Sequence, residues 1–227
     1  MATKPLNTQQ KRLILLGILS LALWVVTETR PILYPLIYLN THIHELCHAL
    51  SAWATGGVPT HIEVYASGSG VAPIRGGVIF IVAAAGYVGA AAIGGLLLAS
   101  SKSADHSKKA IYTLAIFLLF SMIALVRGDL VGIVSGWLWV LLLFGFAKKA
   151  SPTAQQNLVA FLGIQQCLTS TYSLLILQKL TVALETQNDA GIMQDSTGIP
   201  ALFWAILWSL LGIIAMWWGL RKAASTK

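Results

Sequence analysis

The residues best suited to chemistry are five consecutive positions: His44, Glu45, Leu46, Cys47 and His48. On an α-helix each residue advances about 100°, so histidines four positions apart lie on one face, about one turn from each other. Their imidazole nitrogens can then converge on a single Zn²⁺ at about 2.0–2.1 Å. Glu45 stands beside the first histidine, where it can take a proton from a zinc-bound water. We therefore predict His44 and His48 as metal ligands and Glu45 as the general base.

The apolar surroundings strengthen this interpretation. Ionisable groups inside a membrane helix cost about 2.5–3.5 kcal/mol each on insertion scales, and a shared metal is the simplest reason to keep three together. The competing interpretation is a set of hydrogen-bonded core residues or a proton relay. His42 lies about 200° round the helix from His44, so we expect it to support the site or an interface rather than bind the same metal. His61, on the predicted hairpin, can face the cavity, but we interpret it as a solvated loop residue; His106 lies in a basic loop and is assigned no role.

A catalytic zinc site usually has three protein ligands and a water molecule, so one ligand is still missing. Several acidic residues lie near the ends of apolar segments: Glu28, Glu63, Asp105, Asp129, Glu185, Asp189 and Asp195. Counting membrane crossings puts Asp129 and Asp189 on the side where the two histidines lie. Asp129 can instead pair locally with Arg127. The residues alone leave the choice between the two aspartates open.

Composition indicates an integral membrane protein. The chain has 227 residues, of which 56% are hydrophobic and only 10% are charged, whereas soluble domains average about 25% charged residues. The net charge of +7 comes from short Lys and Arg clusters between apolar runs. That distribution suits lipid headgroups and topology signals, and it argues against a nucleic-acid-binding surface.

Apolar runs bounded by charge or proline predict an all-α polytopic protein with about six or seven transmembrane helices, given roughly 20 residues per span. The predicted segments are Leu13–Val26, Ile32–Thr55, Gly77–Ala99, Ala110–Val126, Leu130–Ala147, Thr153–Leu184 and Ala201–Leu220. The glutamines of the sixth segment leave its spanning status open. We treat residues 1–227 as one membrane domain, with an N-terminal segment (1–30), a core (31–147) and C-terminal helices (148–227).

A short β-hairpin is predicted after the helix that carries the two histidines. Residues Thr60 to Ala66 alternate between polar and apolar types, Ser67 to Gly70 form a turn, and Val71 to Ile74 form the return strand. An open hairpin cannot face lipid, so it must lie at the interface or in a protein-walled cavity. An ordinary connecting loop explains the same spacing equally well.

These features together resemble the site-2-protease-like intramembrane zinc metallopeptidases, in the small branch found in bacteria, plants and fungi. The matching blocks are His44 to Leu50, Thr55-Gly56-Gly57, Ser67 to Gly70, Ala85 to Gly89, Phe161 to Leu168, Asn188-Asp189-Ala190, and Thr197 to Pro200 running into Trp204 and Trp208. The resemblance implies that a later carboxylate is the third zinc ligand. Asn188-Asp189-Ala190 is similar to the motif of this branch, which favours Asp189 and keeps Asp129 as runner-up. It also implies that the hairpin pairs with an extended substrate.

The resulting prediction is a zinc-dependent intramembrane or membrane-associated endopeptidase with one Zn²⁺ per chain. Its substrate would be a membrane protein or peptide, and its location a membrane crossed several times, the cell membrane in a bacterium. One alternative is a catalytically inactive, peptidase-like membrane protein that binds or regulates a partner. A transporter is a further alternative, although the chain lacks convincing repeated halves.

Membrane orientation stays open at this level. If every segment spans, the side of the N-terminus collects five cations (Lys4, Lys11, Arg12, Arg75 and Arg127). The other side collects nine (Arg30, Lys102, Lys108, Lys109, Lys148, Lys149, Arg221, Lys222 and Lys227). This excess makes the second side cytoplasmic, whereas Lys11 and Arg12 next to the first segment favour the reverse. If Thr153–Leu184 does not span, the last three cations change sides and the balance reverses.

Overall fold

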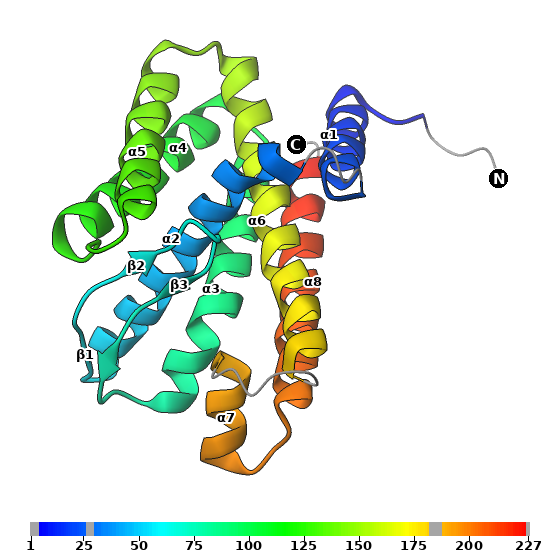
Figure 1. Cartoon of the computed structure of the whole chain (residues 1–227). Helices are drawn as coiled ribbons and strands as arrows, with labels where there is room; N and C mark the ends of the chain where they lie inside the picture. Colours follow the sequence, from blue (N-terminus) through cyan, green and yellow to red (C-terminus); the bar gives the residue numbers. More distant parts are fainter. Residues whose placement is uncertain (1–4, 26–29, 182–187, 226–227) are drawn as a thin grey trace.

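The computed structural model describes residues 5–25, 30–181 and 188–225, which are mostly helical (Figure 1). A helix lies in each of the seven ranges predicted as membrane segments, and one further helix precedes the last of them. The helices are α1 (Thr8–Val25), α2 (Arg30–Ala54), α3 (Ile79–Ser100), α4 (Ala104–Ala124), α5 (Leu130–Lys149), α6 (Pro152–Thr181), α7 (Asp189–Thr197) and α8 (Ala201–Ala224).

Four of the described helices are long and apolar enough to cross a membrane, judged by length and composition: α3, α4, α5 and α8. The other three predicted segments fold as long helices but carry more polar residues. Helix α1 opens with Thr8 to Arg12, α2 holds the histidines and Glu45, and α6 contains several glutamines. The chain is therefore an integral membrane protein, and the described residues account for four of the six or seven predicted spans.

Helix α3 occupies the centre and packs against α2, α6 and α8. Small residues allow these helices to approach closely. A methyl group on Gly219 of α8 would lie 2.6 Å from the carbonyl oxygen of Gly95, and one on Gly94 would lie 2.6 Å from Cys167 Sγ of α6. The main apolar core lies among α2, α3, α4 and α5, and a smaller one joins α3, α7 and α8 around Trp204 and Trp208.

The segment between α2 and α3 contains two small antiparallel strand pairs. The strands are β1 (Val58–Pro59), β2 (Glu63–Val64), β3 (Gly70–Val71) and β4 (Ile74–Arg75), with β1 paired to β4 and β2 paired to β3. The turn between β2 and β3 is closed by a hydrogen bond from Tyr65 N to Ser69 O (2.8 Å), and Gly68 adopts a φ of 88° there. Ile62 forms a parallel bridge with Val126, which attaches this segment to the turn between α4 and α5.

Helix α7 lies between the predicted segments Thr153–Leu184 and Ala201–Leu220, in a stretch for which the sequence predicts no helix. With nine residues it is too short and too polar to show the apolar periodicity that identified the other helices. Local signals nevertheless define both ends: the Asn188 side chain accepts a hydrogen bond from Gly191 N at 2.9 Å, and Gly198 ends the helix in the left-handed conformation (φ 73°).

Helices α1 and α2 follow each other along α6: α1 lies beside its first half, and α2 continues from there. Arg12, near the start of α1, donates a hydrogen bond to Ser101 O (3.0 Å), and Trp24, near its end, donates one to Gln165 Oε1 in the middle of α6 (2.9 Å). Helix α2 continues from that level, where Asn40 donates to Ser170 Oγ (3.2 Å). The sequence-based count that placed Lys11 and Arg12 opposite the α3–α4 turn is therefore wrong. Among the described residues, α1 begins beside the α3–α4 turn and ends near the middle of α6.

Candidate metal centre

The two histidines of the motif project from one face of α2. The opposite face supplies apolar residues at helical spacing, and these are fully buried against the neighbouring helices: Ile43, Leu46, Ala49 and Ala52. This packing fixes the rotation of α2 and directs the imidazoles towards α3 and α7. The Nε2 atoms of His44 and His48 lie 3.0 Å apart, so one helical turn brings both nitrogens to the same point.

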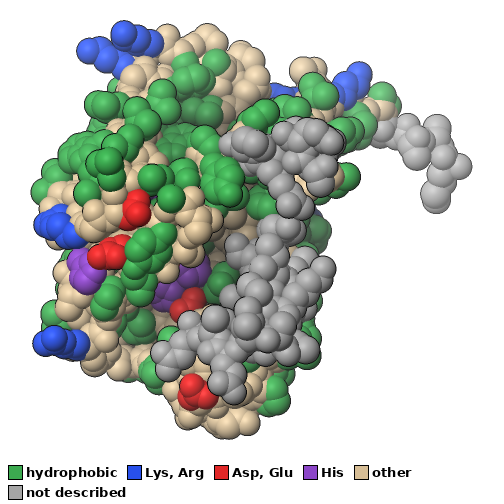
Figure 2. Space-filling view, in the orientation of Figure 1, with side chains coloured by type: hydrophobic (Ala, Val, Ile, Leu, Met, Phe, Trp, Pro, Cys, Tyr) green, Lys and Arg blue, Asp and Glu red, His purple; other side chains and the backbone are tan. Residues whose placement is uncertain are grey.

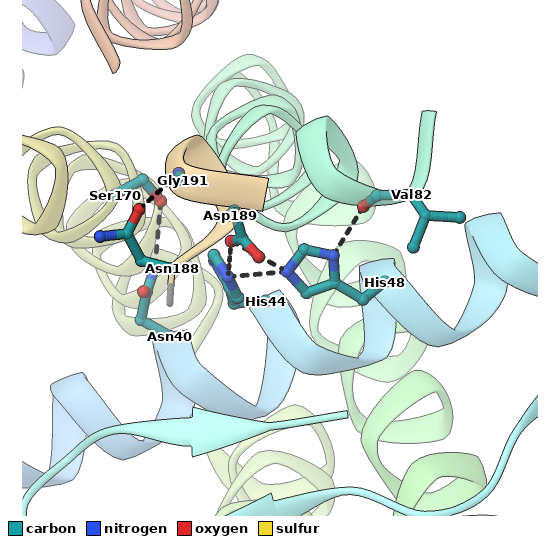
Figure 3. Close-up of polar contacts among 8 residues, drawn as sticks. All are labelled: Asn40, His44, His48, Val82, Ser170, Asn188, Asp189 and Gly191. Atoms are coloured by element: carbon teal, nitrogen blue, oxygen red, sulfur yellow. Dashed lines mark hydrogen bonds and ion pairs between the residues drawn. The ribbon is translucent and has the colours of Figure 1, made fainter. Parts of the chain in front are cut away.

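Asp189 completes a group of three at that point (Figure 3). It is the first residue of α7, directly after the Asn188 cap, and its Oδ2 lies 3.2 Å from the Nε2 atom of each histidine. The helix N-terminus stabilises a negative side chain at this position. Burial acts to raise the pKa of Asp189, but the adjacent imidazoles of His48 and His44 outweigh it and hold that pKa below its ordinary value.

The hydrogen-bonding partner of His48 determines which of its nitrogens is free. Nδ1 lies 2.7 Å from the carbonyl oxygen of Val82 on α3, and a carbonyl can only accept, so Nδ1 carries the proton. In the neutral ring Nε2 then presents a lone pair. The carboxylate oxygen of Asp189 also presents lone pairs, 3.2 Å away. Such groups converge stably only around a cation or shared protons.

The spacing of the three atoms suits a zinc ion. Donors about 2.0–2.1 Å from a tetrahedral zinc lie about 3.4 Å from one another. The three observed separations are 3.0, 3.2 and 3.2 Å. Two imidazoles and one carboxylate are also a frequent donor set for catalytic zinc, and they leave a fourth position open. The residues present therefore fit this metal.

Helix α3 supplies the wall beside the three donor atoms. A methyl group on Gly86 would contact the Nε2 atoms of both histidines, so only glycine leaves that space free. The next residue, Tyr87, packs edge-on against the His44 ring with centroids 4.5 Å apart, and it stacks on Trp208 of α8. In the sequence, Gly86 and Tyr87 are part of the matching block Ala85 to Gly89, and neither was predicted to contact the metal ligands. Nothing in the sequence indicated the Val82 carbonyl.

Glu45 lies next to the donor group and beneath the strands. Its side chain is buried, with 5% of the residue exposed, and it interacts electrostatically with His44, His48 and Asp189. A methyl on Gly70 of β3 would lie 2.9 Å from Glu45 Oε1. The β3 backbone therefore passes directly over the carboxylate, which places an extended segment beside the group that would handle protons.

The remaining candidates lie elsewhere. Asp129, the runner-up ligand, caps α5 and accepts a hydrogen bond from Val131 N at 2.7 Å. His42 points away from the donor group towards α5, where its Nε2 lies 3.1 Å from the carbonyl oxygen of Gly132. His61 pairs with Glu63 at 3.3 Å, and His106 contacts the Ser103 cap of α4.

The site remains partly accessible. The side chains of His44 and Asp189 are 13% and 19% exposed, and Figure 2 shows histidine and acidic side chains near one another on this face. The donor group is therefore not fully enclosed by the helices that build it.

Comparison with known proteins agrees with this arrangement. No curated protein and no solved structure gives a significant match to the chain. The family described as Peptidase M50B-like matches residues 14–219, which include both histidines, Glu45, the strands and Asp189. Proteins of the M50 group are in general zinc-dependent. Because the match covers nearly the whole sequence, the chain belongs to the Peptidase M50B-like family, a site-2-protease-like family of membrane peptidases.

Proposed function

We propose that this protein is a zinc-dependent endopeptidase that crosses the membrane several times and cleaves a membrane protein or peptide within or beside the bilayer. The observation that carries the proposal is the convergence of His44 Nε2, His48 Nε2 and Asp189 Oδ2 within 3.2 Å of one another. Glu45 beside them and the family membership support a hydrolytic role over a purely structural one.

Each residue has a distinct task. His44, His48 and Asp189 would hold one zinc ion per chain, and the Val82 carbonyl keeps the His48 ring in the required tautomer. When bound, zinc supplies Lewis-acid chemistry: it polarises the scissile carbonyl and makes water more acidic. Glu45 accepts the proton of the attacking water on a carboxylate oxygen and passes it to the leaving amine nitrogen. Its burial keeps bulk water from competing for that proton.

The strand segment is the proposed substrate-binding element. The Ile62–Val126 bridge attaches the residue before β2 to the α4–α5 turn. Strand β3 passes over Glu45. An extended peptide that pairs with β3 would have its carbonyl groups delivered to the donor group. Recognition by strand addition uses main-chain hydrogen bonds and therefore tolerates many side chains.

The decisive experiment separates metal binding from catalysis. Purified wild-type protein and Glu45→Gln should each contain about one zinc per chain, because Glu45 is not a ligand. Cells expressing wild type should accumulate new N-termini within membrane proteins, measured by N-terminal proteomics, and cells expressing Glu45→Gln should not.

Asp105→Asn is the matched control, because it removes an exposed carboxylate at the start of α4, outside the donor group and the strand segment, and should retain cleavage. Equal new N-termini from wild type and Glu45→Gln would contradict the proposed catalysis. That outcome together with retained zinc would favour the inactive, partner-binding alternative.

A further inference from the structure

Charged residues are segregated between two ends of the molecule. Among the residues whose side chains the structure describes, nine cations lie at one end, which we call the basic end: Lys11, Arg12, Lys102, Lys108, Lys109, Lys148, Lys149, Arg221 and Lys222. These residues occupy the start of α1, the α3–α4 turn with the start of α4, the last turn of α5 and the last turn of α8. One described acidic residue, Asp105, joins them, and it pairs with Lys109 at 2.8 Å.

Direct contacts show that these four regions form one end. Arg12 and Gln156 both donate hydrogen bonds to Ser101 O, at 3.0 and 3.3 Å, which joins α1 and α6 to the α3–α4 turn. Gln9 donates to Ala223 O at 2.6 Å, which brings in the end of α8. The α5–α6 turn belongs to the same end because Gln155 at the start of α6 donates to Ala147 O (3.0 Å).

The metal centre lies towards the other end, which we call the site end. It comprises the C-terminal half of α2, the four strands, the α4–α5 turn, α7 and the start of α8. The described cations there are Arg75 and Arg127. They are accompanied by five acidic residues: Glu45, Glu63, Asp129, Asp189 and Asp195.

We propose that the basic end faces the cytoplasm and rests among anionic lipid headgroups, so that the metal centre and the strand segment open on the opposite, non-cytoplasmic side. Short cytoplasmic loops carry an excess of Lys and Arg, and the cytoplasmic leaflet attracts such clusters. The structure removes the conflict left by the sequence, because Lys11 and Arg12 now join the other seven cations. Granted the proposed peptidase function, the substrate is a membrane protein whose cleaved segment is presented from the non-cytoplasmic side.

The test is cysteine labelling of the full chain in intact cells with a membrane-impermeant maleimide. Four exposed serines give matched substitutions: Ser69→Cys and Ser196→Cys at the site end, and Ser151→Cys and Ser225→Cys at the basic end. The native Cys47 is half-buried and Cys167 is buried, so the parent chain sets the background. We expect the first pair to react in cells stripped of any outer barrier, and the second pair only after the membrane is permeabilised.

The reverse pattern, or equal labelling of both pairs before permeabilisation, would overturn this orientation. A second variant tests whether the cations cause this orientation; it replaces five lysines by glutamine: Lys102, Lys108, Lys109, Lys148 and Lys149. We expect mixed labelling of both cysteine pairs in this variant. An unchanged pattern would refute the role of these cations. Labelling requires neither zinc nor cleavage, so Glu45→Gln should label like wild type. The orientation can thus fail while the peptidase proposal stands, and the reverse also holds.

Discussion

Replacing Gly86 with alanine tests the metal centre through a residue that is not itself a ligand. The added methyl would touch Nε2 of both histidines and lie 2.5 Å from His44 Cε1, whereas ordinary van der Waals contact begins at 3.4 Å. The rings must therefore retreat by about 1 Å, several times the ~0.2 Å tolerance of metal–ligand distances. Misplacement of about 1 Å can also cost about 100-fold in rate. We expect zinc affinity and cleavage each to fall by about 100-fold or more.

The assay is zinc content of the purified variant by mass spectrometry, together with zinc affinity from competition with a chromophoric chelator. Gly89→Ala is the matched control on the same helix, since its methyl would lie 2.8 Å from Cys47 Sγ and away from the imidazole nitrogens. Overpacking of this kind costs about 1–3 kcal/mol of stability. Both variants should therefore lose thermal stability, and only Gly86→Ala should lose zinc.

Two results would refute this reasoning. If Gly86→Ala bound zinc as tightly as wild type, the histidine nitrogens would not meet where the structure places them. If Gly89→Ala lost zinc to the same degree, the effect would come from general disturbance of the α2–α3 contact. The first result would argue against the three proposed ligands, and the second against a direct effect of the Gly86 methyl group on the histidine nitrogens.

Two further predictions concern the third ligand. Asp189→Ala should purify with little zinc, whereas Asp129→Ala should keep its zinc and lose about 1 kcal/mol of unfolding free energy, because Asp129 is a helix cap. Metal analysis and thermal melts check both variants. Zinc loss in the Asp129 variant alone would reverse the assignment of the third ligand. Asn188→Ala should weaken the N-terminus of α7 by about 1 kcal/mol, equivalent to about fivefold in zinc affinity. Asn188→Ser, which can still cap the helix, should bind zinc like wild type, and equal loss in both variants would argue against capping as the cause.

The sequence predicted most of the helical framework because long apolar runs are a strong signal. Each of the seven predicted segments contains a helix, and the two motif histidines lie on one face as their spacing required. The sequence did not predict helix α7 because it is only nine residues long and five of these are polar, although Asn188 and Gly198 are recognisable as its cap residues. The sequence also did not predict where α1 ends along α6, because that position depends on the contacts of Trp24 and Arg12 with distant helices.

Choosing between Asp129 and Asp189 from the sequence was difficult for a physical reason. Both aspartates lie at the N-terminus of a helix, where the backbone stabilises a negative charge. They therefore give the same local signal, and only the resemblance to a known motif favoured Asp189. What distinguishes them is tertiary: α7 folds back beneath α3 and α8 and delivers its first residue to the histidines, whereas the first turn of α5 packs against the strand segment.

The charge of the assembled site gives a further reason for this choice of residues. Isolated ions are costly to bury in a membrane protein, but the cost falls when opposite charges lie together. The imidazoles of His44 and His48 are neutral as metal ligands, and Glu45 and Asp189 contribute one negative charge each. Two carboxylates balance one divalent cation, so the loaded site would carry no net charge. A second acidic ligand in place of either histidine would break that balance, which explains physically why this site combines two imidazoles with a single carboxylate ligand.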